Sequence, residues 1–98
     1  MSLEELYREA QETLPFVKLQ DGESFEGKFI SVEKAVGYKG KETNEYTFLV
    51  KDIEKTLQTS SFSLLSSMVA AGIKEGDMVR ITRNGEGMST KYKAYKVA

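Results

Sequence analysis

The stretch KTLQTSSFSLLSSMVAAGIKEGDMVRI, residues 55–81, decides the fold because it places one short helix between two strands. Residues 55–60 read as a strand, and a serine-capped helix follows over residues 61–71. Its apolar side chains form one face: Leu64, Leu65, Met68 and Val69. Gly72 is a natural C-terminal cap, and residues 78–82 form the next strand. The chain therefore changes from strand to helix and back within 27 residues.

Three further strands surround this stretch, over residues 24–36, 45–51 and 90–97. Gly27 marks a bulge or bend inside the first of them. Parallel sheets need a crossover helix after each strand, and only one helix separates strands here, so we expect an all-β chain. Five strands with a helix between the third and fourth are typical of the OB-fold, a partly open barrel. An SH3-like barrel is the alternative, and the helix position favours the OB-fold.

An acidic helical segment, residues 1–20, precedes the predicted barrel domain, residues 21–98. Its helix spans residues 2–13, where Ser2 and Glu5 form a capping box. The apolar residues recur at helical spacing: Leu3, Leu6, Tyr7 and Ala10. Pro15 ends this helix. Two interpretations stay open: the helix packs on the barrel or frays, or it is an acidic arm that binds a partner or competes for a basic groove.

Composition narrows the function classes. The 98 residues form one domain and include no cysteine and no histidine, which excludes disulfides, Cys/His zinc sites and histidine general bases. Residues 1–27 carry seven acids and two bases, a net charge of −5, whereas residues 28–98 carry eight acids and twelve bases, a net charge of +4. The acidic start is no signal peptide and no apolar run could span a bilayer, so we expect a cytoplasmic protein without a membrane partner.

No candidate catalytic or cofactor-binding motif in the sequence has all the residues that its chemistry requires. Residues 22–28 match the GxxxxGK part of a P-loop, but Phe29 stands where the magnesium-binding hydroxyl belongs, and the context is turn and strand rather than strand and helix. Asp52 and Glu54 lack further ligands nearby for a divalent ion. The serines between residues 60 and 67 have no histidine to activate them. We therefore expect no cofactor, no metal site and no enzymatic activity.

Basic and aromatic residues gather in the two loops that flank the groove of an OB-fold. Single-strand binders combine a positive groove with aromatic faces on which bases stack, and in OB-folds the groove lies over strands two and three. The loop after the first strand and the loop before the fifth both carry such residues. With outward-facing strand positions added, the candidate site is Tyr38, Lys39, Lys41, Lys51, Arg80, Arg83, Lys91, Tyr92, Lys93 and Phe29.

The alternation of residues along each strand separates core from surface. It turns Tyr46, Phe48 and Val50 inward in the second strand. In the fourth strand it buries Val79 and Ile81 and leaves Arg80 on the surface. In the first strand it buries Ile30 and Val32 and turns Phe29 outward, unless a bulge at Gly27 shifts the register. The fifth strand is ambiguous, since either Tyr92 and Ala94 or Tyr95 and Val97 could face the core.

The stretch from Gly72 to Ile81, followed by a glycine-containing turn and KYKAYKV at residues 91–97, resembles the second half of OB-fold nucleic-acid-binding proteins. The small single-stranded DNA-binding proteins of phages and prokaryotes are the most similar kind, and the pattern of the resemblance spans residues 22–97. Many bacterial members end in an acidic tail that recruits other proteins. This sequence stops at Ala98, directly after the fifth strand, so we expect no recruitment through such a tail unless the acidic N-terminal segment substitutes for it.

The first hypothesis is therefore an OB-fold domain that binds single-stranded DNA with little sequence preference. Lysine and arginine would meet phosphates, and Tyr38, with Phe29 or Tyr92, would stack on bases. Homo-oligomerisation would add avidity. The alternative is an OB module that binds RNA or a protein as a replication or translation accessory, and it predicts little salt-sensitive binding of single-stranded DNA.

Overall fold

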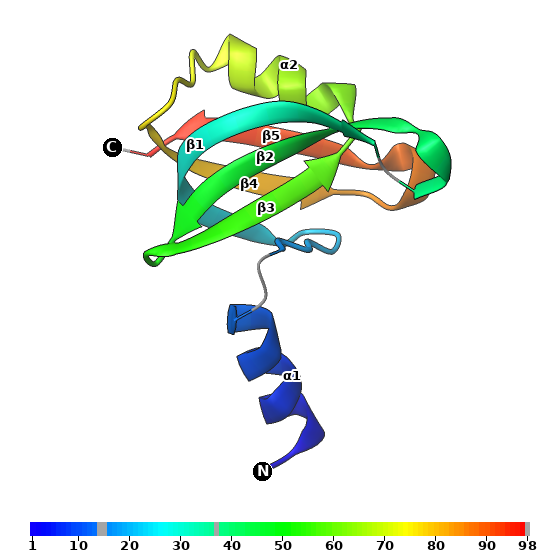
Figure 1. Ribbon diagram of the computed structural model, residues 1–98, viewed down its shortest axis with the longest axis vertical. Helices are drawn as coiled ribbons and strands as arrows, with labels where there is room; N and C mark the ends of the chain where they lie inside the picture. The colour runs from blue at the N-terminus through cyan, green and yellow to red at the C-terminus, as the bar shows by residue number, and fades with distance from the viewer. Residues whose placement is uncertain (14–15, 37, 98) are drawn as a thin grey trace.

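A computed structural model describes residues 1–13, 16–36 and 38–97. It contains five strands in one antiparallel sheet and two α-helices (Figure 1). The elements are α1 (Leu3–Thr13), β1 (Ser24–Val36), β2 (Glu42–Val50), β3 (Ile53–Thr59), α2 (Phe62–Ala70), β4 (Met78–Asn84) and β5 (Lys91–Lys96), with 3₁₀ turns η1 (Tyr38–Gly40) and η2 (Gly87–Ser89). The predicted all-β character and the helix between the third and fourth strands are confirmed.

The strand order is β3-β2-β1-β4-β5, so the long strand β1 lies at the centre of the sheet. Residues 24–28 of β1 pair with β4, whereas residues 28–36 pair with β2. Gly27 lies where β1 passes from one partner to the other. A Cβ at this position would lie 3.0 Å from Cγ2 of Val50 and 3.1 Å from the carbonyl oxygen of Leu49. Only glycine lets the neighbouring strand approach so closely.

The sheet does not close into a barrel, because no pairing joins β3 to β5 among the described residues. Residues before β1 instead cover the free edge of β3. The amide of Val17 donates to the carbonyl oxygen of Thr56 at 2.9 Å, and Phe16 forms a parallel bridge with Thr56. Leu19, two residues further on, is buried in the core. Residues 16–20, hereafter the strap, thus pack against the sheet.

Helix α2 covers the free edge of β5 through two serine side chains. The Tyr92 amide donates to Oγ of Ser63 at 2.9 Å, and the Ala94 amide donates to Oγ of Ser67 at 2.8 Å. The Ser67 hydroxyl donates back to the Ala94 carbonyl at 3.2 Å. Exposed strand edges are templates for unwanted pairing, so the strap and α2 each protect one edge of the open sheet.

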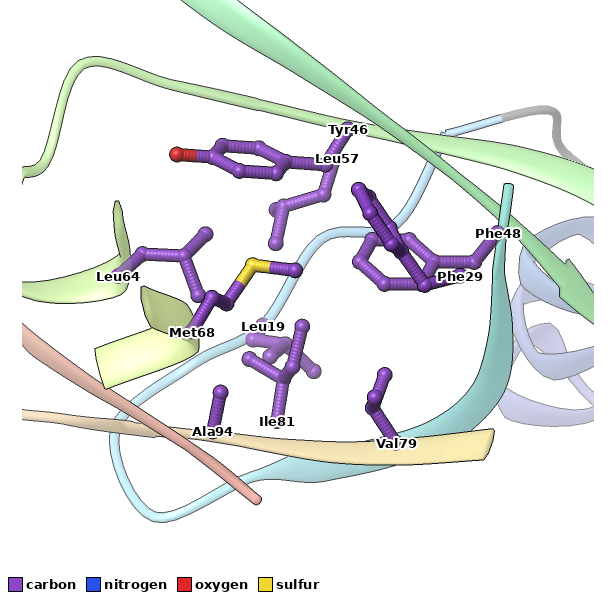
Figure 2. Close-up of a cluster of buried hydrophobic side chains, with 10 residues drawn as sticks. All are labelled: Leu19, Phe29, Tyr46, Phe48, Leu57, Leu64, Met68, Val79, Ile81 and Ala94. Atoms are coloured by element: carbon purple, nitrogen blue, oxygen red, sulfur yellow. The ribbon is translucent and has the colours of Figure 1, made fainter. Parts of the chain in front are cut away.

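The core lies between the curved sheet and α2 (Figure 2). Its buried side chains are Leu19, Phe29, Tyr46, Phe48, Leu57, Leu64, Met68, Val79, Ile81 and Ala94. The inward orientations predicted for Tyr46, Phe48, Val79 and Ile81 are confirmed. The ambiguity in β5 is resolved, since Ala94 is buried and Tyr92 packs against the core while Tyr95 is exposed.

The outward orientation predicted for Phe29 is wrong. Phe29 is 6% exposed and its ring packs 5.7 Å from that of Phe48. The register with β2 shifts between Phe29 and Ser31, which leaves Ile30 as the extra residue of a bulge. The bulge therefore lies at Ile30 and not at Gly27, and it reverses the alternation on which the prediction depended. Val32, predicted to be buried, is 43% exposed.

The helix ends follow local capping rules. The Glu5 amide donates to Oγ of Ser2 at 3.1 Å, which confirms Ser2 as the cap of α1. At the end of α2, Gly72 takes a φ of +67° and the Ile73 amide donates to the Met68 carbonyl at 3.1 Å, as in a Schellman motif. Helix α1 projects from the sheet on the side opposite α2 (Figure 1). No helix in the described ranges is long and apolar enough to cross a membrane.

Candidate functional site

A polar depression lies where β3, α2 and the β4–β5 connection meet. Its volume is about 340 Å³, and its lining includes Thr59, Ser60, Ser61, Arg83, Gly87, Thr90 and Tyr92. A second depression of about 160 Å³ is lined by Lys34, Glu42, Thr43, Asn44 and Ser60. Because Ser60 lines both, the two depressions are neighbours on the surface, and we call them together the polar channel. It joins the bases of the two loops predicted to flank a binding groove, which lie at the same end of the sheet (Figure 1).

The chemistry of the polar channel suits an anionic chain. Hydroxyl and amide groups dominate its lining, and they are joined by the cations Lys34 and Arg83 and by one carboxylate, Glu42. Side-chain hydroxyls and lysine ammonium groups are common partners of phosphate oxygens. Lys41 directly precedes Glu42, and Lys91 lies between the lining residues Thr90 and Tyr92, so both exposed lysines are next to the channel in the chain although their side chains are not part of its lining.

Arg83 has a structural role that the sequence does not reveal. Its guanidinium donates to the carbonyl oxygen of Leu19 in the strap and, at 3.3 Å, to Oγ1 of Thr90. Its Nε atom is buried without a hydrogen-bond partner among the described residues. The side chain therefore ties the strap to the channel wall, and its cationic charge contributes to the channel from a fixed, half-buried position.

Lys51 and Arg80 lie elsewhere. They line a separate groove of about 650 Å³, together with Phe25, Met78 and other residues of β1, β2 and β4. This groove is at the far end of β2 from Asn44, roughly 20 Å away at the usual rise per residue. Arg80 is exposed as predicted, but it forms an ion pair with Glu26 at 3.4 Å and donates to Oγ of Ser24 at 3.2 Å. The predicted site residues thus do not form a single groove.

The remaining predicted residues divide between the loops and β5. Lys39 and Lys41 are exposed in and after η1, and Lys91 and Lys93 are exposed on β5. Tyr92 lines the polar channel but is half-buried and packs against the core. The side chain of Tyr38 lies outside the described residues. Of the three aromatic candidates for stacking, Phe29 is buried and only Tyr92 is located at the channel.

The outer face of β2 and β3, where the groove was expected, carries neither a base nor an aromatic ring. Alternation from the buried Tyr46 and Phe48 turns the intervening positions outward. These outward cross-strand pairs are Glu45 with Gln58, Thr47 with Thr56, and Leu49 with Glu54. Glu33 of β1 lies opposite Glu45, which adds a further carboxylate. This face would repel a phosphate chain.

Several channel residues escaped the sequence interpretation, including Lys34, Asn44, Ser60 and Thr90. Ser60 belongs to the serine-rich stretch from Thr59 to Ser63, which ordinary helix capping could explain, and the other three have no local signal. Asn44 also affects the core: burial raises the pKa of the Tyr46 hydroxyl above its usual value of 10.0, and the Asn44 side chain opposes part of that rise.

Comparison with known proteins adds no assignment. The chain matches no protein-family model, no curated protein and no solved structure. Within the described part of the chain, no three His, Cys, Asp or Glu side chains cluster in a way that could hold a metal ion. The functional argument therefore depends on the chemistry of the polar channel.

Proposed function

We propose that this protein is an OB-fold domain that binds single-stranded nucleic acid, with the phosphate backbone held along the polar channel. The strand order β3-β2-β1-β4-β5 and the position of α2 between β3 and β4 support the fold assignment. The open seam between β3 and β5 is compatible with a partly open barrel, in which the strap and α2 occupy the place of direct strand pairing.

The observation that carries the proposal is that two neighbouring polar depressions lie between the two loops. Their hydroxyls and Lys34 offer donors to successive phosphates without reading any base, and the exposed Lys41 and Lys91 next to them would extend these contacts at the loop ends. Contacts of this kind make binding insensitive to sequence and strongly dependent on salt. Duplex DNA is a poorer ligand in this proposal, because a channel at one end of a small sheet does not match its rigid width.

In this proposal, base stacking contributes less to nucleic-acid binding than the sequence predicts. With Phe29 in the core, Tyr92 is the described aromatic residue at the channel, and Tyr38 remains a prediction. Each stacked base contributes roughly 1–3 kcal/mol, so one or two platforms imply modest affinity. The carboxylates on the outer face of β2 and β3 favour the loop end over the sheet face as the position of the nucleic acid.

Fluorescence anisotropy with a labelled thymidine oligomer of about 30 nucleotides, titrated across a salt series, tests the proposal. We expect the double substitution Lys41→Ala/Lys91→Ala to weaken binding at low salt. It should also flatten the slope of log K against log salt by about 1.4, because each phosphate contact to a single strand contributes about 0.7. A uridine oligomer in parallel distinguishes DNA from RNA as the preferred ligand.

The matched control is Lys51→Ala/Arg80→Ala, which removes two cations from the separate groove. We expect this pair to leave the salt slope unchanged. Absence of binding by the wild-type protein at low salt would contradict the proposal. A larger loss of affinity in Lys51→Ala/Arg80→Ala than in Lys41→Ala/Lys91→Ala would also contradict it, because the nucleic acid would then bind in the groove lined by Lys51 and Arg80.

A further inference from the structure

Helix α2 presents an apolar stripe to solvent. Phe62, Leu65 and Val69 are 77%, 39% and 73% exposed, and their spacing of three and four residues places them on one face. The opposite face is already occupied, because Leu64 and Met68 are buried in the core. The helix FSLLSSMVA carries no charged residue, which is unusual for a surface helix. We call Phe62, Leu65 and Val69 the α2 stripe.

Helix α1 presents a second exposed apolar surface. Leu3 and Leu6 are 85% and 51% exposed and lie on one face, three residues apart. Helix α1 is not among the elements that pack extensively against one another in the described chain. An isolated helix of 11 residues is marginal in water without a packing partner. Both helices therefore expose apolar faces that the fold of one copy leaves uncovered.

We propose that α1 of one copy docks on the α2 stripe of a second copy, and that the reciprocal contact completes a two-fold symmetric dimer. The two helices match in length, about 16 Å for the 11 residues of α1 and about 14 Å for the 9 residues of α2. The stripe on the same copy is not the target, since α1 and α2 lie on opposite sides of the sheet (Figure 1). Two-fold pairing is also the commonest symmetry of homo-oligomers.

Charge favours this occupant. Residues 1–13 carry four acids and one base, whereas residues 14–98 carry eleven acids and thirteen bases, so the arm and the body have net charges of opposite sign. The α2 stripe has no charge of its own to desolvate. An anionic membrane surface is a poor alternative occupant for α1, because interfacial helices use lysine and arginine on their polar face and this one carries Glu4 and Glu5 in its first turn.

A stable interface also needs the apolar area of both reciprocal contacts. Each large apolar side chain can bury on the order of 100 Å² of surface, so the five exposed side chains of one contact supply about 500 Å². Specific interfaces bury at least about 1,000 Å² in total. One contact falls short of that value and the reciprocal pair reaches it, which explains why a symmetric dimer rather than an open chain is the expected product.

Molar mass measured by light scattering over a concentration series tests the proposal. We expect the wild-type chain to form dimers as concentration rises, and Leu6→Glu or Val69→Glu to remain monomeric. An equimolar mixture of the two variants should recover dimers weakly, because one copy supplies an intact α1 and the other an intact α2 stripe. The matched control is Val36→Glu, which changes a valine of the same 73% exposure outside both surfaces and should dimerise normally.

Cross-linking identifies the docking mode, and the chain has no cysteine to interfere. Under mild oxidation, a mixture of Leu6→Cys and Leu65→Cys single variants should give the mixed dimer in excess over either self-cross-linked product. Thermal melts of every variant check that the sheet is folded. A wild-type chain that is monomeric up to its solubility limit overturns the proposal. So does a Val69→Glu variant that still dimerises, because α1 would then pair with α1.

Discussion

At the scale of single residues, two serines complete the edge of a β-sheet. Ser63 and Ser67 are four residues apart on α2, a rise of about 6.0 Å. Their partners Tyr92 and Ala94 are two residues apart on β5, a rise of about 6.7 Å. The helix repeat of four thus nearly matches the strand repeat of two, and each hydroxyl meets one outward-facing amide. This match explains the serine-rich sequence of α2 without any catalytic role.

Removing one of these hydroxyls should destabilise the sheet. Ser67→Ala leaves both the amide and the carbonyl of Ala94 without their side-chain partner. A buried polar group left unsatisfied costs roughly 1–3 kcal/mol, and we expect a loss of that size in the free energy of unfolding measured with urea. The control is Ser66→Ala, one residue away and exposed, which should change stability by less than about 0.5 kcal/mol. Equal losses in both variants would contradict the edge role of Ser67.

At the scale of elements, the strap is part of the folded core although it precedes the first strand. Its amide at Val17 bonds to β3, its side chain at Leu19 is buried, and its carbonyl at Leu19 accepts from Arg83 on β4. It therefore connects β3 with β4, two strands that do not pair with each other. The sequence groups these residues with the acidic helix, because a short irregular segment has no periodicity to show that it is buried.

Shortening one side chain of the strap tests this connection. Leu19→Ala removes a large buried side chain, and such changes typically cost 2–5 kcal/mol, so we expect a loss of about 2–4 kcal/mol in urea unfolding. Val36→Ala is the matched control, because Val36 is 73% exposed on β1, lies outside the helix surfaces and should show almost no change. If the two variants lost the same stability, the strap would not belong to the core.

The elements also show where sequence reasoning succeeds and fails. Alternation predicts the core residues of β2 and β4 well, because one buried face imposes a period of two. It fails in β1 at Phe29, since the bulge at Ile30 has no local sequence signal and the residues before and after it follow opposite alternations. The structural role of Arg83 escapes sequence reasoning for another reason. Its partner Leu19 is 64 residues away, and only the tertiary fold brings them together. The polar channel combines residues of all five strands and η2, so no local stretch of sequence reveals it.

At the scale of the whole molecule, charge is divided between an acidic arm and a mildly basic body. The arm, residues 1–13, carries a net charge of −3 and the body, residues 14–98, a net charge of +2, although the total is only −1. A polyanion that approaches the channel is attracted by the body and repelled by the arm. At low ionic strength the screening length reaches about 30 Å, comparable with the 43 × 35 × 23 Å extents of the molecule. If the proposed function holds, the arm would therefore affect the approach of nucleic acid without touching it.

Neutralising the arm should speed that approach. Glu4→Gln/Glu5→Gln removes two exposed charges from the first turn of α1 and leaves the Ser2 cap in place. In stopped-flow mixing with a labelled thymidine oligomer, we expect the association rate at low salt to rise by roughly two- to five-fold. The increase should vanish near 0.15 M salt, where the screening length is about 8 Å. The dissociation rate should stay constant, because steering changes encounter rather than the bound contacts. A difference that persists at high salt would instead mean that α1 contacts the polar channel directly.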